Sequence, residues 1–186
     1  RHEAIGINFL DIYIRNGLYP WPVEADHVLG SEGAGIIEAI GDDVTGLSVG
    51  DRDGYTLANG AYATHRVIDA GYVVKLPENV SNELAASIML KGLTVAYLIH
   101  DSFKVQAGHT VLFHAAAGGV GLIAGQWLNA LGATVIGTAG GADKCALAKA
   151  NGYHHVIDYK SSDFEAEVMN LTDGKGVDVT YDSVGN

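Results

Sequence analysis

A run of small residues near the middle of the chain carries the clearest chemical signal. Ala116, Gly118 and Gly121 occupy the three positions of the pattern G-x-G-x-x-G, with alanine in the first. In that pattern the first position makes a tight turn, the second lets the backbone approach a pyrophosphate, and the third lets a helix pack closely on a strand. A helix that begins near Gly119 presents free N–H groups and a positive dipole end to phosphate oxygens. These residues predict a dinucleotide site; the alternative is a tight packing turn without a ligand.

The end of the following strand indicates which dinucleotide to expect. An NAD site normally carries Asp or Glu there, about 20 residues beyond the glycines, to bind the ribose 2′-hydroxyl. This chain has the run 138–141 (Thr-Ala-Gly-Gly) at that place, and Lys144 follows one turn into the next helix. Lys144 can pair with a 2′-phosphate as a point charge, and Tyr159 at the end of the third strand can add a hydrogen bond. We therefore expect NADPH rather than NADH.

Two readings compete with this expectation. Taken on its own, Lys144 is more commonly an ordinary solvated helix lysine. Asp143 beside it can compete for the 2′ site, although its simpler role lies at the helix N-terminus, where the helix dipole favours a negative charge. NADH therefore stays the alternative coenzyme.

The elements that must position these residues alternate between strand and helix. The pattern predicts, in order, a strand at 111–114, a helix at 119–132, a strand ending at 138, a helix at 142–151, a strand at 155–159, a helix at 162–171 and a strand at 177–184. Such alternation indicates an α/β fold with a doubly wound parallel sheet, whose ligand lies across the carboxyl ends of the strands.

The first half of the chain has a different pattern. The expected elements are a short strand within 1–7, a helix at 8–15, strands within 30–40, 49–52, 61–68 and 72–76, a helix from Ser81 to about Leu90, and a second helix after Gly92 that reaches His100. Short strands at close, turn-rich spacing suggest a small barrel-like β domain. We place the domain boundary near Lys91, with a substrate domain at 1–91 and a dinucleotide-binding domain at 92–186.

Composition excludes several classes of function. The chain carries 11 basic and 22 acidic residues, a net charge of −11, which repels nucleic acid and acidic membrane surfaces. A single cysteine, Cys145, excludes an internal disulfide framework and suits a reducing compartment. The stretch 105–142 has no charged residue, but its polar residues and glycines favour buried strands and a covered helix over a membrane span. Because the sequence begins without Met in what reads as a strand, and ends on another, we expect a fragment of a longer protein.

Several separate motifs, in the same order along nearly the whole chain, resemble one known family. They are GINFLD (6–11), YIRNGLYP (13–20), LGSEGAG (29–35), VGDR (49–52), LKGLTVAYL (90–98), AAAGGVG (115–121) and VIDY (156–159). Together they resemble the NADPH-dependent quinone oxidoreductases of the zeta-crystallin type, which belong to the medium-chain dehydrogenase/reductase superfamily. The resemblance implies a GroES-like catalytic domain followed by a Rossmann domain, both incomplete here.

The resemblance also implies roles for particular residues. It places Asn8, Tyr13 and Tyr19 around the oxygen of a quinone or enone acceptor. It places Phe9, Asp11 and Thr94 near the nicotinamide. It lines the phosphates and the adenine ribose with Gly119, Val120, Gly140, Gly141, Lys144 and Tyr159, while Gly118 and Gly121 serve the turn and the packing. The implied chemistry is hydride transfer from nicotinamide C4, oriented by the protein in a dry cleft.

Zinc alcohol dehydrogenases of the same superfamily are the natural rival. In them a cysteine and the histidine of a Gly-His-Glu motif hold the catalytic zinc. Here Asn8 stands in the place of that cysteine and Ser31 in the place of that histidine, with Glu32 retained. Amide and hydroxyl oxygens are poor zinc ligands beside thiolate and imidazole, so we expect no catalytic metal.

The sequence therefore predicts a cytoplasmic, homodimeric, zinc-independent NADPH:quinone oxidoreductase that binds no nucleic acid and no membrane. Two alternatives stay open: an NADPH-dependent reductase of alkenals or other enones, and an NADPH-binding protein with little turnover.

Overall fold

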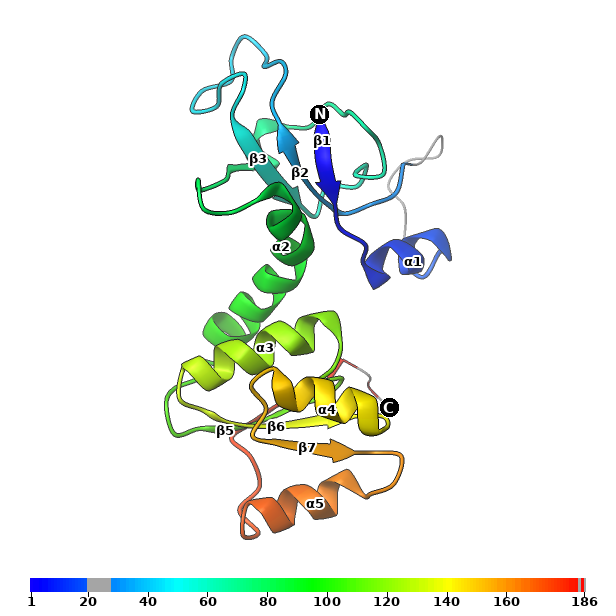
Figure 1. Ribbon diagram of the computed structural model, residues 1–186, viewed down its shortest axis with the longest axis vertical. Helices are drawn as coiled ribbons and strands as arrows, with labels where there is room; N and C mark the ends of the chain where they lie inside the picture. Colours follow the sequence, from blue (N-terminus) through cyan, green and yellow to red (C-terminus); the bar gives the residue numbers. More distant parts are fainter. Residues whose placement is uncertain (20–27, 184, 186) are drawn as a thin grey trace. The chain divides into compact units, whose positions relative to one another are not determined.

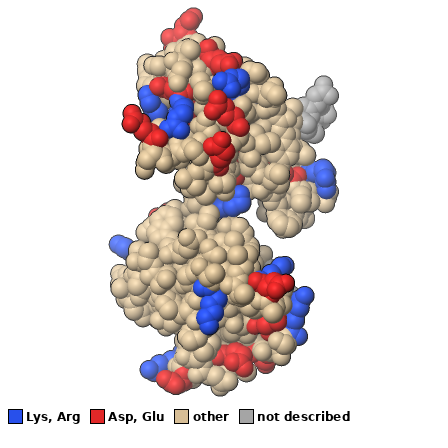
Figure 2. Space-filling view, viewed as in Figure 1, with Lys and Arg blue, Asp and Glu red and all other residues tan. Residues whose placement is uncertain are grey.

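The computed structural model describes residues 1–19, 28–183 and 185, and the chain divides into two compact units, Arg1–Leu90 and Lys91–Asn186. Each unit has a hydrophobic core and a sheet of its own. Figure 2 shows acidic and basic side chains interspersed on the visible face of both units. On that face, the net negative charge is therefore not gathered into one acidic patch.

The first unit is built on an antiparallel sheet of four strands in the order β1-β2-β3-β4 (Figure 1). The strands are β1 (His2–Ile5), β2 (Glu32–Ile36), β3 (Arg52–Thr56) and β4 (Val73–Lys75), and a single 3-10 turn, η1 (Ala70–Tyr72), precedes β4. All five residues of β2 pair with β3, from Glu32 opposite Thr56 to Ile36 opposite Arg52. This continuous pairing fixes the buried start of β2, where the candidate site lies.

Two strand predictions in this unit are wrong at their positions. Residues 49–51 form a turn, because Gly50 has a φ of +92° and the Asp51 carboxylate accepts the Ser48 N–H, so β3 begins only at Arg52. The segment 61–68 is a loop. Its first backbone N–H groups fold back onto residues 29 and 30 instead of joining a strand ladder.

Helix α1 (Phe9–Arg15) lies where the sequence predicts it, whereas α2 (Asn82–Tyr97) differs from the prediction. The expected break at Gly92 is absent: α2 runs through this glycine and continues into a π-helical turn, η2 (Leu98–Ser102). A mid-helix glycine costs only about 1 kcal/mol relative to alanine, which the flanking helix formers offset. By length and composition 82–102 is apolar enough to cross a membrane, but core helices pass the same test, so this is weak evidence.

The second unit has the predicted parallel sheet, in the order β7-β6-β5-β8. Its elements are β5 (Thr110–Phe113), α3 (Gly119–Ala130), β6 (Thr134–Ala139), α4 (Ala142–Ala150), β7 (His155–Asp158), α5 (Phe164–Leu171) and β8 (Val179–Tyr181). From β5 the chain moves outward through β6 and β7 and then returns to the other side of β5 with β8. This reversal beside β5 is the switch point at which open α/β sheets bind ligands. The predicted end of the last strand, Val184, lies outside the described residues.

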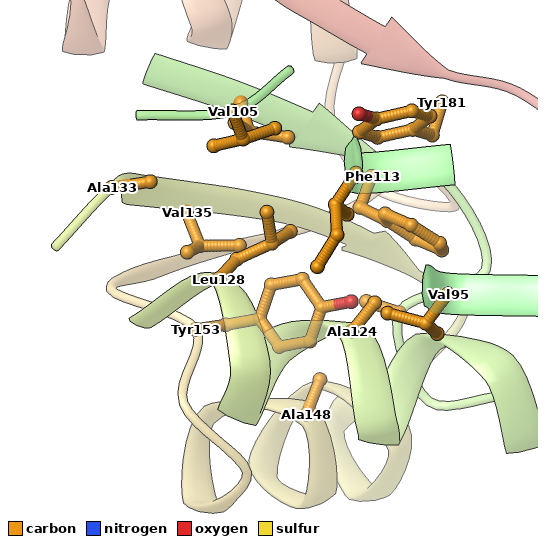
Figure 3. Close-up of a cluster of buried hydrophobic side chains, with 13 residues drawn as sticks. Val95, Val105, Phe113, Ala124, Leu128, Ala133, Val135, Ala148, Tyr153 and Tyr181 are labelled. Carbon is orange, nitrogen blue, oxygen red and sulfur yellow. The ribbon is translucent and has the colours of Figure 1, made fainter. Parts of the chain in front are cut away.

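Helices α3 and α4 cover one face of this sheet and α5 covers the other (Figure 1). On the first face Leu128 and Val135 lie beside the ring of Tyr153 (Figure 3), and Val111 belongs to the same buried cluster. The neighbouring strand residues Leu112 and Ile136 belong to the smaller core under α5, as expected from the alternation of side chains along a strand. The two cores hold the carboxyl ends of β5, β6 and β7 at one edge.

Candidate functional site

The predicted turn after β5 begins α3 with glycines, which carry no side chain of their own. Gly118 is the N-cap of α3 and its N–H donates to the Ala115 carbonyl at 2.8 Å. Because the N-cap has no side chain, no side-chain hydrogen bond caps this helix start. The N–H groups of the first helical turn, from Gly119 to Gly121, therefore point out of the helix without intrahelical acceptors.

Gly121 allows the helix to lie on the turn. A Cβ at Gly121 would stand 2.5 Å from the Ala115 carbonyl oxygen and 2.7 Å from that of Ala116, so no other residue fits there. The Gly121 carbonyl accepts a hydrogen bond of 2.8 Å from the hydroxyl of Tyr153, whose pKa is raised by burial. Ala116 is fully buried and its N–H donates to Thr138 in β6. Alanine at the first position of the G-x-G-x-x-G pattern therefore serves the packing of the turn against β6.

A lysine that the sequence pattern did not single out lies against this turn. The Cδ atom of Lys91 is 3.0 Å from the position that a Cβ on Gly119 would take. The stem of Lys91 thus covers the first residue of α3. Spacing alone gives no signal for this contact, because 28 residues of chain separate the two positions.

The residues predicted for the 2′ end of a dinucleotide meet beyond β6. A Cβ at Gly140 would stand 2.6 Å from the Tyr159 hydroxyl, so the phenol lies directly over this glycine. Gly141 is the N-cap of α4 with a φ of +95°, a conformation that favours glycine. Lys144 lies exposed in the first turn of α4. Its neighbour Asp143 also lies in that first turn, where the dipole favours a carboxylate.

The first unit buries the residues predicted for the acceptor site in a polar cluster at the start of α1. Asn8 is the N-cap of α1 and is 7% exposed. Its Nδ2 donates to Oε2 of Glu32 at 3.0 Å. Glu32 is fully buried, and its Oε1 accepts the N–H of Leu90 at 2.7 Å. These bonds fix the orientation of the Asn8 amide, with its nitrogen toward Glu32.

Asp11, predicted to lie near the nicotinamide, uses its carboxylate inside the protein. It is 4% exposed. Its Oδ1 accepts the Ser31 hydroxyl at 2.8 Å, and its Oδ2 accepts the Asn8 N–H at 2.9 Å and the Tyr62 hydroxyl at 2.8 Å. Burial and this bond to Asp11 raise the pKa of Tyr62 to about 12. Tyr62 was not predicted as part of a site, since it belongs to no catalytic spacing pattern, and Ser31 was considered only as the residue in the place of a zinc-binding histidine.

Three aromatic side chains form a ladder on the surface beside this cluster. The ring centroids of Phe9 and Tyr13 are 6.2 Å apart, and those of Tyr13 and Tyr19 are 6.0 Å apart. All three are exposed, Phe9 to 73%, Tyr13 to 40% and Tyr19 to 50%. Such faces suit stacking against a flat conjugated ring, and the two tyrosines add hydroxyl groups.

The two positions that carry zinc ligands in zinc dehydrogenases are occupied here by Asn8 and Ser31, whose side chains make other contacts. The Asn8 amide and the Ser31 hydroxyl both donate to buried carboxylates. Within residues 1–19 and 28–183, no three side chains of His, Cys, Asp or Glu converge as metal ligands would. The donor set at this place is therefore an amide and a hydroxyl, which zinc binds poorly.

The predicted residues thus fall into two sets, one in each unit. In the first unit Asn8 and Asp11 share the buried cluster, and Phe9, Tyr13 and Tyr19 share the ladder. In the second unit the turn holds Gly118, Gly119, Val120 and Gly121, and the group beyond β6 holds Gly140, Gly141, Lys144 and Tyr159. Thr94 lies half-buried on α2.

Comparison with known families and proteins gives matches in both units. Residues 1–78 match the family model of the alcohol dehydrogenase GroES-like domain, and residues 119–186 match the model of the zinc-binding dehydrogenases. The chain is 48% identical over 186 residues to a quinone oxidoreductase of Pseudomonas aeruginosa, and the match covers 100% of this chain and 57% of that protein. It is 44% identical over 191 residues to a 2-haloacrylate reductase of a Burkholderia species, again with 100% and 57% covered.

A solved structure shows the same likeness in three dimensions. The crystal structure of Escherichia coli quinone oxidoreductase complexed with NADPH superimposes with a TM-score of 0.96 at 47% identity, covering 100% of this chain and 57% of that one. The doubly wound parallel sheet and the preceding GroES-like unit predicted from the sequence are confirmed. The chain spans 57% of the length of these relatives.

Proposed function

Because the chain belongs to the medium-chain dehydrogenase/reductase superfamily and resembles its quinone oxidoreductases, we propose that the protein containing it reduces quinones with NADPH and without zinc. The proposal extends to the cytoplasm as its location and to a homodimer as its assembly. Sedimentation of the full-length protein tests the second point, and a monomer at all concentrations would remove it.

The observation that carries the coenzyme proposal is the presence of glycines just beyond the carboxyl ends of two neighbouring strands. They lie at 118–121 after β5 and at 140–141 after β6. The turn at Gly118 leaves the first N–H groups of α3 open to a diphosphate. Gly140 keeps the space under the Tyr159 hydroxyl free of a side chain. Residues 139–141 include no carboxylate of their own, and the nearby Asp158 carboxylate at the end of β7 is engaged by the Gly141 N–H at 2.9 Å. The NADPH complex of the E. coli relative supports the same coenzyme here.

When bound, NADPH supplies a hydride from C4 of its nicotinamide. The proposed part of this chain is to orient the acceptor and to stabilise the negative charge that develops on its oxygen. Asn8 suits this role because its amide nitrogen carries two N–H groups, of which Glu32 takes one. The hydroxyl groups of Tyr13 and Tyr19 can donate to the same oxygen, and their rings can stack on the quinone.

The buried cluster supports zinc independence. The charge of Asp11 is met by Ser31, Tyr62 and the Asn8 N–H, so the cluster is satisfied by its own hydrogen bonds. In such a site, donors of hydrogen bonds polarise the acceptor in place of a Lewis acid. We therefore expect chelator-treated protein to retain its activity.

A second candidate is reduction of an electron-poor carbon–carbon double bond by the same hydride. The 44% identity to a 2-haloacrylate reductase favours it, because that protein is named for such an acceptor. The same donors would then polarise the carbonyl or carboxylate conjugated to the double bond. A third candidate, an NADPH-binding protein with little turnover, lacks a specific observation in its favour.

The discriminating experiment follows NADPH oxidation by the full-length protein with 1,4-benzoquinone, an alkenal, 2-chloroacrylate, or no acceptor, before and after chelation of metals. We expect oxidation with the quinone, at a rate that chelation leaves unchanged. Oxidation with the alkenal or haloacrylate alone would establish the second candidate. NADPH binding without oxidation would leave only the binding role. Loss of activity on chelation, restored by zinc, would contradict the metal-free mechanism.

A further inference from the structure

The group beyond β6 contains a second lysine that the sequence pattern did not indicate. Lys160 directly follows Tyr159 at the end of β7. Its Cε is 3.1 Å from the position that a Cβ on Gly140 would take, while the Tyr159 hydroxyl is 2.6 Å from it. Both side chains therefore cover the same glycine. The ammonium group is one bond beyond this Cε atom.

The backbone under Lys160 is held in place by one carboxylate. Oδ1 of Asp158 accepts the N–H of Lys160 at 3.0 Å and the N–H of Gly141 at 2.9 Å. These two bonds, with a smaller contribution from the charge of Lys160, lower the pKa of the Asp158 carboxyl. One side chain thus ties the turn before α4 to the residues after β7. The sheet adds a further bond between the same segments, from the Tyr159 N–H to the Ala139 carbonyl at 3.2 Å.

The ammonium group of Lys160 is exposed to solvent. Its charge acts on the Asp158 carboxylate and lowers the pKa of that group, but no salt bridge joins Lys160 to another residue within the described part of the chain. On the far side of Gly141, Lys144 lies exposed in the first turn of α4. A phosphate monoester carries about 1.5 to 2 negative charges at neutral pH, which one lysine balances only in part. Two exposed lysines, Lys160 beside Gly140 and Lys144 in the first turn of α4, together match that charge.

We propose that Lys160 is a second cation for the 2′-phosphate of NADPH and a determinant of the preference for NADPH over NADH. This inference rests on the proposed function and adds a residue to its coenzyme site. Asp158 is then a positioning residue, because it fixes the backbone of Lys160 and of Gly141 without contacting the ligand itself.

The test measures affinities of the full-length protein for NADPH and for NADH by coenzyme fluorescence. Lys160→Ala should weaken the affinity for NADPH about tenfold, which is the loss expected for one charge-assisted hydrogen bond. The same change should alter the affinity for NADH less than twofold. Lys160→Arg should retain NADPH affinity because it retains the charge. Lys149→Ala removes an equally exposed lysine in the last turn of α4 and should change neither affinity.

The possible failures are distinguishable. If Lys160→Ala leaves NADPH affinity unchanged while Lys144→Ala weakens it, Lys160 has no role at the 2′-phosphate and the proposed function stands. If Lys160→Ala weakens the affinities for NADPH and for NADH equally, the lysine supports the fold of the turn and the inference is overturned. If the unaltered protein binds neither coenzyme, the proposed function itself fails and the inference fails with it.

Discussion

At the scale of single residues, Asp11 does the most to organise the candidate acceptor site. It lies at the third position of α1, and three neutral donors from different parts of the first unit converge on its carboxylate. No salt bridge joins it to a lysine or arginine among the described residues. The free energy of the buried charge therefore depends on these three hydrogen bonds and on the dipole of α1.

Asp11→Ala should destabilise the protein by about 3 kcal/mol, because each buried donor left without an acceptor costs about 1 to 3 kcal/mol. The same change should lower quinone turnover, since the Asn8 N–H loses the acceptor that holds this N-cap. Urea denaturation measures the first effect and NADPH oxidation the second. Asp42→Ala, at an exposed carboxylate in the turn after β2, is the matched control and should change stability by less than about 0.5 kcal/mol. Equal effects of the two substitutions would remove Asp11 from its organising role.

The sequence predicts only some of the candidate site residues of the two units, because the others depend on contacts between distant segments. The glycines of the turn and Lys144 follow from spacing along one strand–turn–helix unit. Ser31, Tyr62 and Lys160 act through contacts between segments distant in sequence or through backbone geometry. Such contacts depend on packing, which a spacing pattern does not contain.

At the scale of elements, glycine plays different structural roles at two positions, one in α2 and one in α3. Gly92 lies inside α2 with nothing within 4 Å of the place where a Cβ would stand. Gly121 lies in the first turn of α3, pressed against two carbonyl oxygens. The sequence predicted a helix break at the first and a close approach at the second, and only the second is found. The residue type was the same, and tertiary contact decided the outcome.

The pair of substitutions Gly92→Ala and Gly121→Ala tests this account. Gly92→Ala should stabilise the protein by up to about 1 kcal/mol, because alanine is the better helix former and meets no neighbour. Gly121→Ala should cost about 3 kcal/mol and abolish coenzyme binding, because the new methyl group forces α3 off the turn. Thermal unfolding with and without NADPH measures both. A Gly121→Ala protein that binds NADPH normally would contradict the assignment of this turn to the diphosphate.

The β-rich half was predicted less well than the α/β half. In the second unit, buried strands and helices alternate with clear periods, and all of its elements lie near their predicted positions. In the first unit the predicted strands at 49–51 and 61–68 rest on short, weakly apolar segments. There, the positive φ of Gly50 and the backbone bonds to residues 29 and 30 produce a turn and a loop.

At the scale of the whole molecule, the proposed function divides between the two units. In the second unit, we propose that the switch point of the parallel sheet and the glycines after β5 and β6 take the coenzyme. In the first unit, we propose that the polar cluster and the aromatic ladder take the acceptor. Since the chain spans 57% of the length of its relatives, the proposed activity is one to measure on the full-length protein.

The most direct test of the central claim is a crystal structure of the full-length protein soaked with NADPH and zinc. The account predicts the diphosphate at the N–H groups of Gly119 and Val120, the 2′-phosphate between Lys144 and Lys160, and no metal at Asn8 and Ser31. A coenzyme bound elsewhere, or a zinc ion coordinated at Asn8 and Ser31, would contradict it.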